Sequence, residues 1–168
     1  MPDLWTKGYS QAELDHAQAK FELVFPPDLV ALLREKQLIK GYDWRDESSI
    51  RKMLEWPFEC LLFDVEHNDL WWPEWAERPS QAADRKEVLQ AVVSRAPRLI
   101  PLSSHRFLPA FPCEPGNPVF SMHGSDTIVY GATLDDYFRR EFDRQTKGPL
   151  PRAVRSIPFW SELVARNH

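Results

Sequence analysis

The sequence changes its pattern at Pro97, and this change is what most constrains the fold. Before Pro97 apolar residues recur with helical spacing, whereas after it they gather in short segments bounded by Pro, Gly, Asn or Asp. Such segments are typical of strands joined by tight turns. We expect strands at LIPL, RFLPAF, PVFSMH and TIVYG. Because helices lead, strands follow and helices close the chain, the sequence predicts an α+β fold rather than alternating α/β units.

Helix starts and ends are marked by capping residues and prolines. Ser10 and Glu13 have the spacing of a capping box, which predicts a first helix from there to about Phe21. Pro26 and Pro27 start a second helix, whose leucines recur on one face. Further helices are expected from Ser80 to a point before Pro97, from Thr133 to Phe142 and from 156–158 onward.

The stretch around Pro57 is expected to change from helix to strand. Proline lacks a backbone donor and normally breaks a helix interior, so a third, short helix over 48–56 is expected to end there. The apolar run Cys60–Val65, bounded by charge and proline, then predicts the first strand.

Composition narrows the class of protein. The 168 residues are 43% hydrophobic and 12% aromatic and show no linker or repeat, so we expect one folded domain over 1–168. Cys60 and Cys113 match neither a disulfide framework nor a zinc spacing. No apolar run approaches the ~18 residues of a membrane span, and the N-terminus is charged where a signal peptide is apolar, so a cytoplasmic location is expected. The net charge of −4 argues against a nucleic-acid partner.

The strongest electrostatic feature is the acidic segment from Glu55 to Glu77, which holds seven acids, four of the seven tryptophans and no Lys or Arg. From Arg139 onward the balance reverses, with seven basic residues against three acids. Trp71 and Trp72 would face opposite sides of an extended chain, so at least one is expected to be partly exposed. Such a tryptophan among acids is typical of a hot spot for a basic protein, although the tryptophans could instead cover the sheet. The partner-binding candidates are Asp64, Glu66, Asp69, Trp71, Trp72, Glu74, Trp75 and Glu77.

Residue types that could serve catalysis are present without a diagnostic spacing. Cys113, His105 or His123, and Asp126 are the types needed for a nucleophile, a base and an orienting acid. The alternative is a small buried cysteine and two histidines bonded to the backbone. No phosphate-binding loop or nucleophile elbow occurs, and we therefore expect a non-catalytic protein without a cofactor.

One short stretch also has the residue types of a metal site. Asp64, Glu66 and His67 form a possible set of hard-metal ligands, since Asp64 and Glu66 would share one face of a strand. The alternative is a strand end whose acids accept hydrogen bonds from the following loop. No second ligand cluster accompanies them, so we expect no metal.

Three blocks of the sequence resemble the SUKH superfamily, which is named for a yeast regulator of cell-wall synthesis and its bacterial and viral relatives. The blocks are LEWPFECLLFDVEHNDLWWPEWAERPS, APRLIPLSSHRFLPAFP and GNPVFSMHGSDTIVYGATLDDYFRREF, and FPPDLVALL is similar to an early helix of that family. The resemblance covers roughly 24–143, with 144–168 as a C-terminal helical extension. It implies a single α+β domain with one mixed, mostly antiparallel sheet flanked by helices.

The same resemblance implies a function. Most bacterial members are immunity proteins that bind and block a cognate toxin, so we expect a basic toxin domain as the partner. The alternatives are a regulatory scaffold of the cell-wall regulator type or a small hydrolase using His105, Cys113 and Asp126. The resemblance implies structural roles for His105–Arg106 and Asn117–Pro118 as loop-fixing pairs, with Asp64 or Asp126 as ionic partner of Arg106. Its structural motif residues are Arg78, His105, Arg106, Asn117, Pro118, Asp126, Tyr130 and Gly131.

Overall fold

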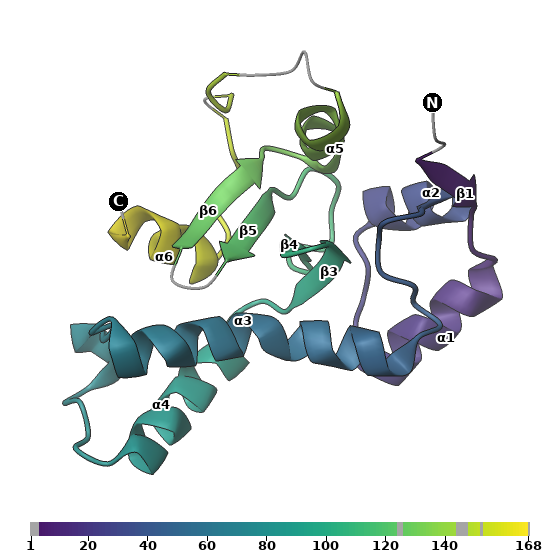
Figure 1. The fold of residues 1–168 in the computed structure, drawn as a ribbon. Helices are drawn as coiled ribbons and strands as arrows, with labels where there is room; N and C mark the ends of the chain where they lie inside the picture. The colour runs from purple at the N-terminus through teal and green to yellow at the C-terminus, as the bar shows by residue number, and fades with distance from the viewer. Residues whose placement is uncertain (1–3, 124–125, 144–147, 152, 168) are drawn as a thin grey trace.

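The computed structural model describes residues 4–123, 126–143, 148–151 and 153–167, which form six α-helices and two antiparallel sheets (Figure 1). The α+β class predicted from the sequence is confirmed. The strands form one sheet of two and one of four, and every described strand pair is antiparallel, where the resemblance implied a single mixed sheet. The second sheet arises because two short N-terminal segments pair only with each other.

The N-terminal part of the chain contains the small sheet and two helices. Its elements are β1 (Trp5–Lys7), α1 (Gln11–Phe21), α2 (Pro27–Glu35) and β2 (Lys36–Leu38). The predicted capping box is present, since the Ser10 hydroxyl accepts from the Glu13 amide and the Glu13 carboxylate accepts from the Ser10 amide. The second helix begins at Pro27, where proline's missing donor costs nothing. Both predicted helices are confirmed.

Helix α3 (Glu47–His67) runs beneath both the N-terminal part and the larger sheet (Figure 1). The predictions of a helix end at Pro57 and a strand over Cys60–Val65 are wrong, because α3 continues through both. An internal proline costs a helix about 3 kcal/mol. Here it is buried, and the residues beyond it place Leu61 and Val65 in the core at helical spacing. Tertiary burial along the rest of the helix outweighs the local penalty.

The remaining chain forms the larger sheet and the helices that cover it. These elements are η1 (Pro73–Trp75), α4 (Ala82–Ser94), β3 (Leu99–Ser103), β4 (Arg106–Pro109), β5 (Val119–His123), β6 (Asp126–Gly131), α5 (Leu134–Phe142) and α6 (Trp160–Arg166). The four strands follow one another in the order β3-β4-β5-β6, as expected for consecutive hairpins. All four predicted strands and the three predicted later helices are confirmed, with the strand in RFLPAF ending at Pro109.

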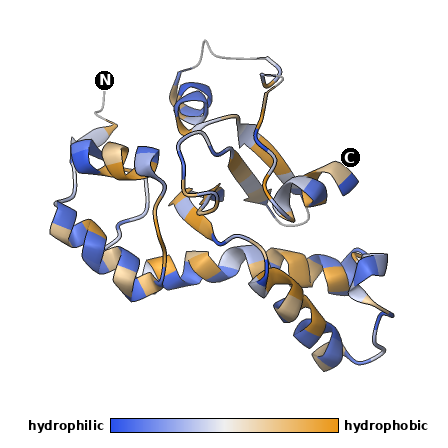
Figure 2. Ribbon diagram, turned by 180° about the vertical axis from the view of Figure 1, so that it is seen from behind, coloured by the Kyte–Doolittle hydropathy of each residue, from blue (hydrophilic) through white to orange (hydrophobic). Residues whose placement is uncertain are grey.

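The four-stranded sheet separates two apolar cores. Phe107 and Phe120 point to the core shared with α3, α4 and α6, whereas Leu108 and Val119 point to the core shared with α1, α2 and α5. This alternation follows from the two-residue period of a strand. Figure 2 shows hydrophobic residues along the second half of α3 and on α4, where the two helices lie side by side. No helix in the described ranges is both long and apolar enough to cross a membrane.

Candidate functional site

The acidic segment 55–77 forms the second half of α3, the following loop and η1. Its tryptophans mostly belong to the core. Trp72 and Trp75 are only 7% and 8% exposed, and their rings stack with centroids 5.2 Å apart. Both were predicted to bind a partner, but the structure covers most of each side chain within the protein, and their role in partner binding stays a prediction. The cause of this burial is η1, whose turn folds Trp75 back onto Trp72, while the ring of Phe159, next to α6, also contacts Trp72.

Trp71 differs from its two neighbours. It is half-buried, its ring meets the edge of Trp75 at 5.3 Å, and its indole nitrogen donates to the carbonyl of Ala76. Trp71 is therefore less buried than Trp72 and Trp75 and presents more surface to a partner than either of them.

Three of the predicted acidic contacts are engaged within the protein. Asp64 is 8% exposed and accepts from the Asn68 side chain, and its burial raises the pKa of its carboxyl group. Glu66 forms a two-bond ion pair with Arg85 of α4, at 2.7 and 2.9 Å. This guanidinium lowers the pKa of Glu66. Since Asp64 is enclosed and Glu66 is neutralised, neither offers a free surface charge.

Glu74 is the third engaged acid, and its partner comes from the basic tail. Both of its carboxylate oxygens accept from Arg166 in the last turn of α6, at 2.6 and 3.2 Å. The carbon of the Arg166 guanidinium also lies 3.9 Å from the centre of the Trp72 ring. The C-terminal extension therefore packs directly on the acidic segment.

Other acids of the segment remain exposed. Glu55, Glu59, Asp69 and Glu77 form no salt bridge with any residue that the structure describes. Glu55 and Glu59 are one turn apart on the solvent face of α3, and the next residue along this face is Phe63, which is 53% exposed. We call Glu55, Glu59 and Phe63 the α3 stripe. Sequence reasoning missed Phe63 because it assigned this stretch to a strand, whereas a helical reading would have aligned the three residues.

The α3 stripe borders a groove between α3 and α4 with a volume of about 450 Å³. Phe58 and Leu62 from α3 and Val93 from α4 provide its apolar floor. Glu55 and Glu59 line it on the α3 side, opposite Lys86. An apolar floor with an acidic wall suits the apolar and basic side chains of a second protein.

The residues considered for catalysis do not converge. The ring centroids of His105 and His123 lie 4.8 Å apart, and Asp126 of β6 is the register partner of His123 in β5. Cys113 lies beyond the far end of β4, where its thiol is 3.7 Å from the carbonyl of Phe25. The length of a β-strand thus separates the thiol from both histidines. The predicted nucleophile and base are not brought together.

The metal-ligand set also fails to assemble. Asp64 and Glu66 would share a face of a strand, but on a helix residues two apart point in nearly opposite directions. The ring of His67 packs against Phe63, with centroids 4.5 Å apart. Among the residues that the structure describes, no three potential ligands form a metal-binding group.

His105 and Arg106 build a polar cluster at the start of β4. The Arg106 guanidinium contacts His105, the Ser121 hydroxyl and the Glu141 carboxylate, and it lies 3.8 Å over the ring of Tyr130. The carboxylate beside Arg106 is that of Glu141 rather than Asp64, which points into another part of the fold. The cluster therefore ties β4, β5, β6 and α5 together.

The other motif residues hold loops and close contacts. The Asn117 side chain is fully buried and donates to the carbonyls of Pro109 and Pro112, while the neighbouring Pro118 is also buried. Arg78 donates to the carbonyl of Val65 near the end of α3. These contacts fix the β4–β5 loop and the segment before α4.

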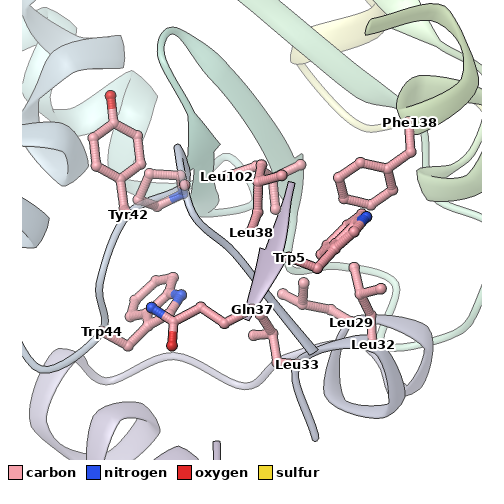
Figure 3. A pocket seen from close by; sticks show the side chains of 12 residues that line it. Trp5, Leu29, Leu32, Leu33, Gln37, Leu38, Tyr42, Trp44, Leu102 and Phe138 are labelled. Atoms are coloured by element: carbon pink, nitrogen blue, oxygen red, sulfur yellow. The ribbon is translucent and has the colours of Figure 1, made fainter. Parts of the chain in front are cut away.

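An apolar cavity lies between the N-terminal sheet, β3 and α5 (Figure 3). Trp5 points toward Phe138 on one side of it, and Leu29, Leu33 and Leu102 lie around it (Figure 3). Its volume of about 30 Å³ holds only one or two water molecules. Ligand pockets are commonly ~300–1,000 Å³, so this cavity is a packing defect rather than a substrate site.

Comparison with known proteins adds no relative. No family model, no curated protein and no solved structure matches this chain.

Proposed function

We propose that this protein binds a basic protein partner through the α3 stripe and the adjoining groove, and that it acts as an immunity-type protein that neutralises a toxin. The observation that carries the proposal is the exposure of Phe63 on the same face of α3 as Glu55 and Glu59, whose carboxylates form no salt bridge with any residue that the structure describes. An apolar anchor bordered by charges of one sign is the arrangement of an interface hot spot.

The charge of the α3 stripe favours a basic partner. An enzyme that acts on an anionic substrate has a basic cleft, and an acidic surface that covers this cleft both attracts and blocks it. The resemblance of residues 54–80 to a block of the SUKH superfamily supports the same function, because α3 and its stripe lie mostly within that block.

Co-expression tests the proposal. The protein is expressed together with the product of each neighbouring gene, and growth and complex formation are measured. We expect one neighbour to be toxic alone and harmless with this protein. Replacing both Glu55 and Glu59 by Lys should abolish protection, mainly by slowing association.

A matched control exists for the apolar anchor. Phe111 is 58% exposed, similar to Phe63, but lies in the β4–β5 loop away from α3. Phe63→Ala should weaken binding, whereas Phe111→Ala should leave it unchanged. Equal effects of both variants, or no protection against any neighbour, would refute the proposal. Stable binding to a host protein without protection would instead favour the regulatory scaffold.

A further inference from the structure

The last turn of α6 places an internal guanidinium on the acidic segment. All three nitrogens of the Arg166 guanidinium are bonded, to both oxygens of Glu74 and to one oxygen of Glu162. The carbon of this guanidinium lies 3.9 Å over the centre of the Trp72 ring. Two carboxylates and an aromatic face are the groups that recognise an arginine side chain in protein complexes.

Space next to Arg166 extends this site. Two hollows of about 320 Å³ each adjoin it, and both are lined by Trp72 and Arg166. One of them is also lined by Trp71, which is only partly buried. The ionisable residues that line the two hollows are Asp64, Asp69, Glu74, Glu162, Arg95 and Arg166. Acids outnumber bases even without Asp64, which is enclosed, so the site has room and charge for another basic segment.

Arg166 can leave this site without unfolding α6. The helix is anchored by Trp160 and Leu163, which are fully buried, and by a hydrogen bond from the Trp160 indole to the carbonyl of Pro97. The Arg166 side chain, in contrast, is 30% exposed at the end of the helix. Exposed ion pairs are weak because water competes for both partners. Rotation of one side chain is therefore enough to empty the site.

We propose that Trp72, Glu74 and Glu162 form a guanidinium-binding site, which the chain's own Arg166 occupies in the free protein and which an arginine of the partner protein occupies in the complex. This inference rests on the protein-binding function proposed above and names one side chain that the partner presents. Arg166 thereby acts as an internal competitor that weakens binding of arginine-bearing segments.

The geometry selects arginine over lysine. A planar guanidinium can lie over Trp72 and bond both oxygens of Glu74 at once, as Arg166 does. An ammonium is a point charge and cannot make the parallel pair of bonds. Citrulline keeps the planar shape of the arginine side chain but has no charge. A peptide that carries citrulline therefore distinguishes recognition of shape from recognition of charge.

The test uses Arg166→Ala, which removes the competitor, and a short peptide with one central arginine flanked by apolar residues. Binding is followed by tryptophan fluorescence, since Trp72 lies in the site. We expect the variant to bind the peptide about tenfold more tightly than the unmodified protein. This factor applies if the site is open in about a tenth of the unmodified molecules and in nearly all molecules of the variant. Lysine and citrulline versions of the peptide should bind weakly.

Two further variants keep the result interpretable. Arg139→Ala removes an arginine that is ion-paired with Asp135 on α5, outside the site, and should leave peptide binding unchanged. Arg166→Gln provides a second open site if the alanine variant is unstable. Equal peptide binding by the unmodified protein and both Arg166 variants, or equal binding of the citrulline peptide, would overturn the inference. The Glu55/Glu59 variant should lose toxin protection but bind the peptide normally. This result would show that the guanidinium-binding site works independently of the α3 stripe.

Discussion

The Nε2 atom of His105 lies 2.8 Å from a terminal nitrogen of the Arg106 guanidinium. A guanidinium only donates hydrogen bonds, so Nε2 must accept and His105 must be neutral, with its Nδ1 proton directed to the Ser104 hydroxyl 2.8 Å away. Burial, the charge of Arg106 and the ring of His123 lower the pKa of His105 below its usual 6.5, against an opposing effect of Glu141.

This contact makes stability depend on pH. Below the usual pKa of about 6.5 the unfolded chain binds a proton at His105 more readily than the folded protein does. The stability from this residue is therefore fully present above about pH 6.5 and decreases as the pH falls below it. We expect urea denaturation to show a lower free energy of unfolding at about pH 5 than at about pH 7.5.

A glutamine at position 105 separates this effect from other titrations. His105→Gln retains an acceptor for Arg106 but cannot be protonated, so the decrease in stability between these pH values should become smaller. His16→Gln, at an exposed position of α1, is the matched control, and the pH dependence should change more in His105→Gln than in this control. An unaltered pH profile in His105→Gln would contradict the neutral, accepting role of His105.

Substitution of the buried tryptophans should destabilise the protein. Trp72→Ala and Trp75→Ala each remove a large ring from the core on one side of the sheet, at a cost of about 3–5 kcal/mol. Trp71→Ala, at a half-buried position, should cost clearly less. Denaturant unfolding monitored by circular dichroism measures all three. A small effect at Trp72 and Trp75 would mean that their stacked arrangement is not maintained in solution.

Asn117 should be the most sensitive polar residue of the β4–β5 loop. Its amide donates to the Pro109 and Pro112 carbonyls and its oxygen accepts from Arg155 at 2.7 Å. Asn117→Ala leaves these groups without a partner, which costs about 1–3 kcal/mol for each one that stays buried. The exposed Asn167→Ala is the control. The melting temperatures of the two variants are compared. Equal melting temperatures would contradict the structural role of the Asn117 side chain.

Gly131 should not tolerate a larger side chain. A Cβ atom there would lie 2.7 Å from the Cα and Cβ atoms of Tyr137, a fully buried residue at the start of α5. Forcing these apart should cost about 1–3 kcal/mol. At Gly41 the nearest atom to a new Cβ is 3.0 Å away, so Gly41→Ala should be milder. Thermal melts measure the two variants, and Gly131→Ala should have the lower melting temperature. The reverse order would contradict the close contact between Gly131 and Tyr137.

Much of the fold could be predicted because its signals are local. The capping box at Ser10, the proline at the start of α2 and the turn residues between the four strands act over a few positions. Their effect on the backbone is the same in any fold. The order of helices and strands, and hence the α+β class, follows from these signals without knowledge of long-range contacts.

The candidate site could be predicted only in part. Clustering of acids and tryptophans in 55–77 is visible in the sequence, but the strand assigned over Cys60–Val65 concealed Phe63 beside Glu55 and Glu59. That error had a physical cause. The local penalty of Pro57 is readable from the residue itself, whereas the core burial that overrides it depends on α4 and the sheet.

The sequence by itself determined the segregation of helices and strands. It also determined the charge pattern, with acids concentrated in the segment 55–77 and basic residues in excess from Arg139 onward. Only the tertiary structure decided which of these groups remain on the surface. It buries Trp72 and Trp75, pairs Glu66 with Arg85 and brings Arg166 to Glu74 across 92 residues of chain. Such pairs depend on how the elements pack around the sheet, and a charge or an indole carries no local signal that tells which distant residue will cover it.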